Sequence, residues 1–461
     1  MPEYMSQSDA FTWAMESDPR LRSTVVTVIM LDRSPDWDVV RSRFEVVGRN
    51  LPIFRQIVVE SPPPTPPRWE FAPDFDLDFH LRRVSAPEPG NLDGVLEMAR
   101  VAAMADFDRA RPLWTATLIE GLDDGGAAVL LKFHHALTDG VGGVQIAMTI
   151  FDLTEEPREV EAVTAGSEEP EVHRHGPLSA FADDVADAIR YDAGLVRQAV
   201  TGAVTKGPKL LLDSIRRPLQ TASSAAELAG SVYRFVRPVN ETGSPLMKQR
   251  SLHRRLGVHK VPLAKLKEAA HRGGGALNDA FVAGIAGGLR RYHDKHGASV
   301  GDLHLTMPIS VRTEGDGMGG NHITLARFDV PVGLADPAKR IAETRERTTK
   351  VRNERSTPYV QILAGAMNLM PRWYIGSMLR KVDFLASDVP GVPVPVYLGG
   401  AKVCTQYAFG PTIGAAVNVT LLTYCDSCVL GIDVDTGAIP DYDEFHKCLV
   451  DGFDEVLALA D

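Results

Sequence analysis

Apolar, β-branched runs alternate with segments of helical spacing along this chain. The runs at 24–31 and 127–131 predict buried strands, because Val, Ile and Leu dominate both. Ser-Pro-Asp at 34–36 is typical of a helix start and predicts a helix to about residue 47. A further helix is predicted at 92–104 and a strand at 114–119. The first part of the chain is therefore expected to form a sheet with flanking helices.

The C-terminal part repeats this mixture of strands and helices. Predicted strands span 303–312, 323–332, 384–391 and 401–403, and a hairpin pairs 414–424 with 428–434. Predicted helices span 263–270, 276–293, 337–354, 359–379 and 443–460. Asn278 or Asp279 is the expected cap of the second of these helices. The fold class is therefore α/β, in the mixed α+β sense.

An acidic, proline-containing stretch at 155–176 interrupts the pattern and predicts a linker, followed by helical spacing to about residue 237. We therefore divide the chain into an N-terminal half (1–154), a linker with a basic helical connector (155–251) and a C-terminal half (252–461).

A shorter alternation at 75–84 predicts a half-buried strand. It places His80 on the polar side of that strand. The functional interpretation of His80 is a second catalytic base, and the preferred one is a histidine on the solvent side of a strand.

The chemistry concentrates where the strand at 127–131 ends. His134 and His135 follow it, and Asp139 and Gly140 close a glycine-containing turn before the next helix. A neutral imidazole near pH 7 can take a proton from an alcohol or a thiol and return it later. A pair of core histidines in a glycine-rich turn is the simpler interpretation. Two adjacent histidines with an acid four residues on, at a strand end, favour catalysis.

Composition narrows the class of protein. The chain has 461 residues and a formal net charge of −11, which disfavours a general nucleic-acid surface. Its four cysteines argue against a disulfide framework and favour a reducing compartment. Cys425 and Cys428 have metal-site spacing, but no second pair follows, so we expect no metal site. Neither a signal peptide nor a membrane-spanning run is predicted.

The His-His-x-x-x-Asp-Gly pattern resembles the motif of CoA-dependent acyltransferases, and within them the bacterial wax ester synthase/diacylglycerol acyltransferase family. Further matches occur in the same order along nearly the whole chain. They are Arg111-Pro112-Leu113-Trp114, Leu277-Asn278-Asp279, Pro308-Ile309-Ser310-Val311-Arg312, Gly320-Asn321, and Ser387-Asp388-Val389-Pro390-Gly391.

This resemblance implies two chloramphenicol-acetyltransferase-like halves with the active-site tunnel between them. It implies transfer of a fatty acyl group from acyl-CoA to diacylglycerol or a long-chain alcohol, giving triacylglycerol or wax ester. His135 would be the general base, with His134 and Asp139 beside it in the catalytic motif. Gly140, Asn278, Asp279, Arg312, Ser387, Asp388, Pro112 and Trp114 would bind substrate or support the structure. No bound cofactor is implied, and acyl-CoA is the co-substrate.

Position 388 departs from the family, which usually has Asn where this chain has Asp. The amide donor is lost there, which affects the expected acceptor preference or rate. In the wider superfamily the motif aspartate pairs with a distant arginine, so the resemblance predicts an ion pair between Asp139 and Arg312. Asp139 would then be structural.

Two alternative functions remain: an acyltransferase acting on a polyketide or peptide on a carrier protein, and a catalytically silent lipid-binding homologue. The expected location is the cytoplasm, or peripherally on the inner face of the cell membrane or on lipid inclusions. Residues 190–260 carry thirteen Lys and Arg against four acids. This stretch, including Arg216, Arg217, Arg254 and Arg255, predicts either contact with anionic lipid or a CoA phosphate, or a solvated helix face.

Overall fold

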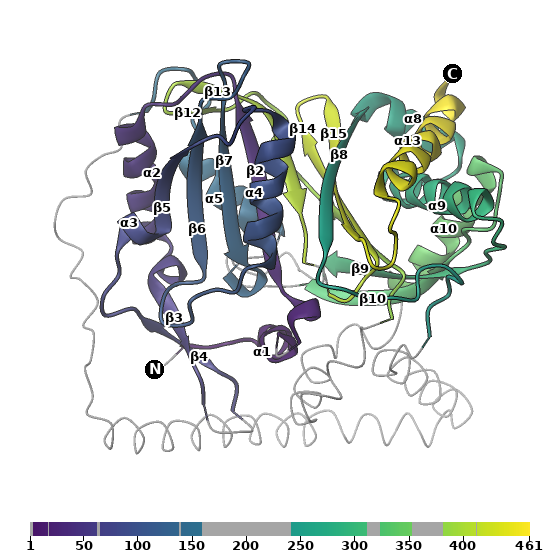
Figure 1. Ribbon diagram of the computed structural model, residues 1–461, viewed down its shortest axis with the longest axis horizontal. Helices are drawn as coiled ribbons and strands as arrows, with labels where there is room; N and C mark the ends of the chain where they lie inside the picture. Colours follow the sequence, from purple (N-terminus) through teal and green to yellow (C-terminus); the bar gives the residue numbers. More distant parts are fainter. Residues whose placement is uncertain are drawn as a thin grey trace, which may run out of the picture.

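The structure of this chain is a computed structural model that describes residues 3–16, 18–61, 65–137, 140–158, 241–310, 323–352, 381–411 and 413–461. Two six-stranded sheets stand side by side, each with helices packed on it (Figure 1). The two-half mixed α/β architecture expected from the sequence is confirmed.

The first sheet has the strand order β12-β13-β2-β7-β6-β5, and its neighbours are antiparallel except for the parallel pair β5 and β6. Its strands are β2 (Thr24–Leu31), β5 (Leu81–Ser85), β6 (Trp114–Glu120), β7 (Ala127–His134), β12 (Tyr397–Leu398) and β13 (Ala401–Phe409). Helix α4 (Leu92–Met104) covers one face, where Val95 and Ala99 pack with Val26 and Val28 of β2. Helices α2 (Trp37–Asn50) and α5 (Gly140–Ile150) lie on the opposite face (Figure 1).

The second sheet has the order β10-β9-β11-β14-β15-β8. Its strands are β8 (Arg254–Pro262), β9 (Leu303–Ser310), β10 (Ile323–Val330), β11 (Phe384–Val389), β14 (Val417–Tyr424) and β15 (Ser427–Asp435). Strand β11 runs parallel to β9 and β14, and the other neighbours are antiparallel. Its helices are α8 (Leu263–Arg272), α9 (Leu277–Lys295), α10 (Pro337–Arg352) and α13 (Tyr442–Leu457), which gather on one side of this sheet (Figure 1).

The chain crosses between the halves once more than the sequence predicts. Strands β12 and β13 come from the C-terminal half, but β13 pairs with β2 of the first sheet, with Tyr407 opposite Val28. The predicted C-terminal half, 252–461, therefore needs a correction, because 397–409 belong to the first sheet. The physical reason is that the exposed edge of β2 is completed by a strand from the other half, which also prevents edge-to-edge association.

The remaining described elements of the first half include a small sheet of β1 (Glu3–Tyr4), β3 (Gln56–Val59) and β4 (Arg68–Phe71). They also include α1 (Gln7–Met15), α3 (Leu77–His80) and short 3-10 turns at Pro19–Leu21, Pro52–Arg55 and His135–Leu137. In the second half, a 3-10 turn at Ala458–Ala460 follows α13 and packs on α8.

The predicted strand at 75–84 is wrong in its first half. Asp76 caps a short helix by accepting the amide of Asp78, and only Leu81–Ser85 is strand. His80 is consequently fully buried and not on the solvent side. Its Nδ1 lies 2.6 Å from the carbonyl oxygen of Trp114, and the two rings stack at 4.8 Å. Burial lowers the pKa of His80.

The cap of α9 is also different from the prediction. The helix begins at Leu277 with Ala276 as the N-cap, so neither Asn278 nor Asp279 occupies that position. Asp279 lies in the first turn and accepts the amide of Ala276 at 2.8 Å. A carboxylate in the third position can satisfy the cap amide from inside the helix. The predicted connector helices and the predicted helix at 359–379 lie outside the described residues.

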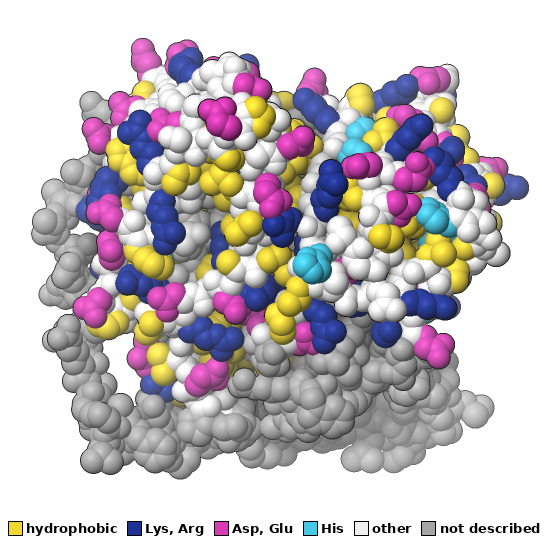
Figure 2. Space-filling model, viewed as in Figure 1, with side chains coloured by type: hydrophobic (Ala, Val, Ile, Leu, Met, Phe, Trp, Pro, Cys, Tyr) yellow, Lys and Arg dark blue, Asp and Glu magenta, His cyan; other side chains and the backbone are white. Residues whose placement is uncertain are grey.

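Acidic and basic side chains are interspersed over the described part of the face in Figure 2. Among the described residues, no helix combines the length and apolar character needed to span a bilayer.

Candidate active site

A cavity of about 250 Å³ lies between the first sheet and helices α2 and α5, and it opens toward the second half. Alternate residues of strand β2 line the cavity, because successive side chains of a strand point to opposite faces. These residues are Val25, Thr27 and Ile29. Apolar groups dominate its wall: Phe44, Val47, Phe54, Trp114, Leu131, Phe133, Ile146, Ile150, Phe151, Val389, Val392 and Leu422.

The second half contributes the other end of the cavity. Ser387 and Asp388 of β11 and Thr420 of β14 line it, and Ser387 lies opposite Thr420 in the sheet. The Thr420 hydroxyl accepts the amide of Gly410, the residue just after β13. Polar groups from both halves thus meet at one place on an otherwise apolar cavity. Such a combination is typical of small-molecule sites.

His135 lines this cavity directly after β7 ends. Its amide donates to the carbonyl of Ser23 at 2.8 Å, which ties the turn to the start of β2. The imidazole is therefore presented by a backbone that is hydrogen-bonded on the strand side, in the wall of the cavity. The geometry suits a group that must meet substrate.

His134 has a different environment, because it is fully buried and does not line the cavity. Its Nδ1 accepts the amide of Ala136 at 3.0 Å, so the ring proton is carried by Nε2. Nε2 lies 3.2 Å from Oε1 of Glu16. The ring of Trp13 packs against His134 edge to face at 5.5 Å. His134 therefore holds the turn in shape.

Glu16 is the functional residue that sequence reasoning missed. Its Oε1 also accepts the amide of Ser23 at 2.7 Å, so it links α1, the start of β2 and the histidine turn. Burial raises the pKa of Glu16, but the hydrogen bonds from His134 and Ser23 and the charge of Arg109 outweigh it, and the pKa lies below the ordinary value. The only sequence signal was indirect: a buried histidine needs an acceptor.

Asp388 carries a carboxylate with no hydrogen bond or ion pair among the described contacts. The residue is exposed to solvent where it lines the cavity, and desolvation by the surrounding walls raises its pKa to about 6. A carboxylate without a protein partner beside mostly apolar walls is less favourable than one in bulk water, and a ligand that donates to it would offset this cost. Asp388 is thus placed to contact substrate.

Lys132 is a buried cation next to the same cavity. Burial lowers its pKa to about 8, and its ammonium donates to the carbonyl of Ala105 at 2.8 Å. The ammonium also lies 4.2 Å from the centre of the Phe107 ring. These contacts hold the ammonium group at the C-terminal end of α4, so the cavity stays mainly apolar.

Two family models match the chain in succession. The wax ester synthase/diacylglycerol acyltransferase catalytic domain matches residues 5–281, and the C-terminal domain of the same family matches residues 319–456. The chain belongs to the wax ester synthase/diacylglycerol acyltransferase family. As a member of this family it is an acyltransferase.

Relatives of this family are similar over almost their full length. A putative diacylglycerol O-acyltransferase of Mycobacterium tuberculosis H37Rv is 37% identical over 96% of this chain and 90% of the relative. A second one from the same organism is 27% identical over 94% of this chain and 92% of the relative.

Solved structures share the fold. The wax ester synthase/diacylglycerol acyltransferase of Marinobacter aquaeolei VT8 superposes with a TM-score of 0.62 at 19% identity, covering 99% of both chains. The first condensation domain of the calcium-dependent antibiotic synthetase gives 0.61 at 14% identity, covering 100% of this chain and 96% of that one. The expected chloramphenicol-acetyltransferase-like fold is therefore confirmed.

The structure brings together only part of the site that the family resemblance predicts. His135, Ser387, Asp388 and Trp114 line one cavity. Trp114 is also a core residue, since its Nε1 donates to the carbonyl of Phe54 at 2.8 Å. Pro112 is buried beside it, and its carbonyl accepts the Trp114 amide.

Asn278 and Asp279 lie outside the described cavity wall. The Asn278 amide contacts the sulfur of Met307 at 3.5 Å, one residue before Pro308 of the wall. Asp279 is buried and lies 3.4 Å from Arg345. Gly140 begins α5. Asp139 and Arg312 lie outside the described residues, so their ion pair stays a prediction.

Proposed function

We propose that this acyltransferase moves a fatty acyl group from acyl-CoA to the hydroxyl of diacylglycerol or a long-chain alcohol, forming triacylglycerol or wax ester. The observation that carries the proposal is that His135 lines a mostly apolar cavity to which both halves contribute. Relatives named diacylglycerol O-acyltransferase support the acceptor class.

In this mechanism His135 takes the proton of the acceptor hydroxyl, and the oxygen attacks the thioester carbonyl. The carbon–sulfur bond then breaks, and His135 returns the proton to the departing thiolate, so no covalent enzyme intermediate is needed. The apolar wall holds a hydrocarbon chain and excludes water from the thioester. At about 250 Å³ the cavity suits part of one slender chain, since typical ligand pockets start near ~300 Å³.

The acceptor would be taken from a lipid surface, because long-chain alcohols and diacylglycerol partition out of water. We accordingly propose a cytoplasmic protein that contacts the membrane or lipid inclusions peripherally. The match to the catalytic-domain family model favours this function over the carrier-protein alternative.

The test is thiol release from palmitoyl-CoA by purified protein, with diacylglycerol and hexadecanol offered in parallel. His135→Ala should lower turnover by ~10²–10⁴-fold, the usual effect of losing a general base. His134→Ala should reduce activity together with thermal stability, since that ring supports the turn. Near-normal thiol release by His135→Ala with either acceptor would exclude the mechanism.

A further inference from the structure

A second, basic pocket of about 290 Å³ lies near the active-site cavity. Its described lining is Arg20, Lys248, Gln249, Arg250, Lys381 and Gly414. Four of these six residues are cationic, and none of the six carries a carboxylate. Because the whole chain has a net charge of −11, this local excess of positive charge stands out.

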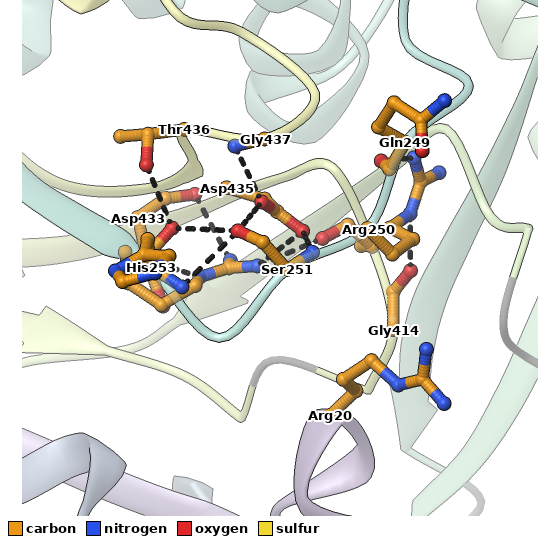
Figure 3. Close-up of polar contacts among 12 residues, drawn as sticks. Arg20, Gln249, Arg250, Ser251, His253, Gly414, Asp433, Asp435, Thr436 and Gly437 are labelled. Carbon is orange, nitrogen blue, oxygen red and sulfur yellow. Dashed lines mark hydrogen bonds and ion pairs between the residues drawn. The ribbon is translucent and has the colours of Figure 1, made fainter.

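Arg250 is held in this pocket by carbonyl groups (Figure 3). Its Nε donates to Gly414 at 2.8 Å, and its other nitrogens donate to the carbonyls of Met247, Gln249 and Val382 at 2.6–2.7 Å. These four bonds leave one of the five N–H groups of the guanidinium uncommitted. No carboxylate forms a hydrogen bond or an ion pair with Arg250 among the described contacts, although Asp383 and Asp435 act on its charge from farther away, so the charge is fixed in position and only partly balanced.

Two lysines add to this charge. Lys248 is exposed, and Lys381 is half-buried with its ammonium 3.4 Å from the Lys248 carbonyl. Neither has a carboxylate partner among the described contacts. Arg20 is partly neutralised, because it forms two 3.0 Å hydrogen bonds with Asp18. Like charges gathered in this way repel each other, and a bound anion would relieve the repulsion.

Two short segments of the chain connect the pocket to the active site. The amide of Gly414 donates to the carbonyl of Arg20 at 2.9 Å, which joins the two segments. Gly414 is three residues from Pro411 of the cavity wall, and Arg20 is three residues from Ser23, which holds the His135 amide. Three residues span at most ~11 Å. The pantetheine arm of CoA, with its two amide-linked units, is long enough to bridge such a separation.

We infer that this pocket binds the phosphate groups of CoA while the thioester lies at His135. The inference rests on the proposed function and adds the subsite for the donor. The one uncommitted N–H of the Arg250 guanidinium and the two lysine ammonium groups are charged donors that suit phosphate oxygens. This assigns Lys248 and Arg250 to the phosphate interpretation of the basic stretch predicted from the sequence.

Other members of that stretch do not share this role. Arg254 is buried, with its Nε 2.8 Å from Asp433, so the predicted contact of Arg254 with lipid is wrong. Figure 3 shows Asp433 and Asp435 in a polar network with Ser251, to the left of Arg250. Arg255 lies 3.2 Å from Asp443. Arg216 and Arg217 lie outside the described residues.

The test compares Lys248→Glu/Lys381→Glu with Lys267→Glu/Lys350→Glu. The control pair consists of exposed lysines outside the pocket and makes the same change in net charge. Calorimetry would measure binding of CoA and, separately, of pantetheine. We expect the pocket variant to bind CoA roughly tenfold more weakly or worse, with pantetheine binding unchanged. The KM for palmitoyl-CoA should rise likewise, while the KM for palmitoyl-pantetheine and kcat stay the same.

Equal CoA affinity in wild type and pocket variant would overturn the inference, and so would an equal loss in the control variant. Loss of binding to phosphatidylglycerol vesicles with CoA affinity unchanged would also overturn it, because it assigns the charges to lipid. Normal CoA binding without turnover of either donor would contradict the proposed function alone. Thermal melts of both variants identify any loss of folding.

Discussion

Among single side chains, Glu16 accepts the buried amide of Ser23 and places its Oε1 3.2 Å from Nε2 of His134, next to the catalytic turn. Glu16→Ala would leave the Ser23 amide without an acceptor and remove the carboxylate that faces His134, at a cost of ~1–3 kcal/mol for a buried donor. We therefore expect the free energy of unfolding to fall by about 2 kcal/mol or more, with a lower kcat. Glu16→Gln keeps a carbonyl acceptor and should recover most of both.

The pH dependence of the free energy of unfolding distinguishes the effect of the Glu16 charge from the effect of its hydrogen bonds. Its pKa is below the ordinary value of 4.5 in the folded protein, so the charge stabilises the fold above pH 4.5 and this contribution is lost as pH falls through the folded pKa. The stability difference between wild type and Glu16→Gln, measured by chemical denaturation, should shrink below pH 4.5. A difference that stays constant with pH would assign no role to the charge.

The pKa of Asp388 is shifted in the opposite direction from that of Glu16. Burial raises its pKa to about 6 from an ordinary value of 3.8, so the folded protein takes up a proton between these values. Its contribution to stability is therefore highest below about pH 4 and falls as pH rises through 6. Asp388→Asn should raise the free energy of unfolding at pH 7.5 by on the order of 1 kcal/mol, a figure reduced for contact with cavity water, and leave it unchanged at pH 4.

Because Asp388 lines the cavity, the same variant should change the ratio of diacylglycerol to hexadecanol turnover. Asp123→Asn, at an exposed loop position, is the matched control and should change neither property. An Asp388→Asn variant with wild-type stability at pH 7.5 and an unchanged acceptor ratio would contradict the assignment of Asp388 to the substrate wall.

At the level of helices and strands, the sequence predicted the elements whose pattern is carried by their own residues. The run at 24–31 forms β2, and 92–104 forms α4 with the same limits. The strand predicted from the alternation at 75–84 was wrong at its start, because Asp76 caps a helical turn there. The hydrogen bond of the cap favoured helix over the strand that the apolar–polar alternation predicted.

Strand β13 was predicted as three residues and has nine. Its interior includes Thr405 and Gln406, which weaken the apolar signal, and its length depends on pairing with β2 from the other half. The residues of the active site also divide into those with local sequence signals and those that depend on distant parts of the chain. His135 and Asp388 could be found from motif and resemblance. By contrast, the histidine that Glu16 contacts lies far along the chain, and Gln406 reaches the cavity because β13 crosses to the first sheet.

At the scale of the whole molecule, the two sheets meet where β13 passes β15. An added Cβ on Gly431 of β15 would come within 2.0 Å of the carbonyl oxygen of Ala408 in β13. Backbone cannot move aside as a flexible side chain can, so a side chain at 431 must push the two sheets apart. Ala408 also lines the cavity, and therefore the displacement reaches the active site.

Gly431→Ala should accordingly lower the free energy of unfolding by about 1–3 kcal/mol, the usual cost of overpacking, and reduce acyl transfer as well. Because β13 completes the first sheet while its chain neighbours build the second, both halves should lose stability in one transition, measured by calorimetry. Gly301→Ala is the control, since a Cβ there meets no atom within 4 Å. Two separate transitions in Gly431→Ala, or stability and activity equal to the control, would show that the crossing strand does not couple the halves.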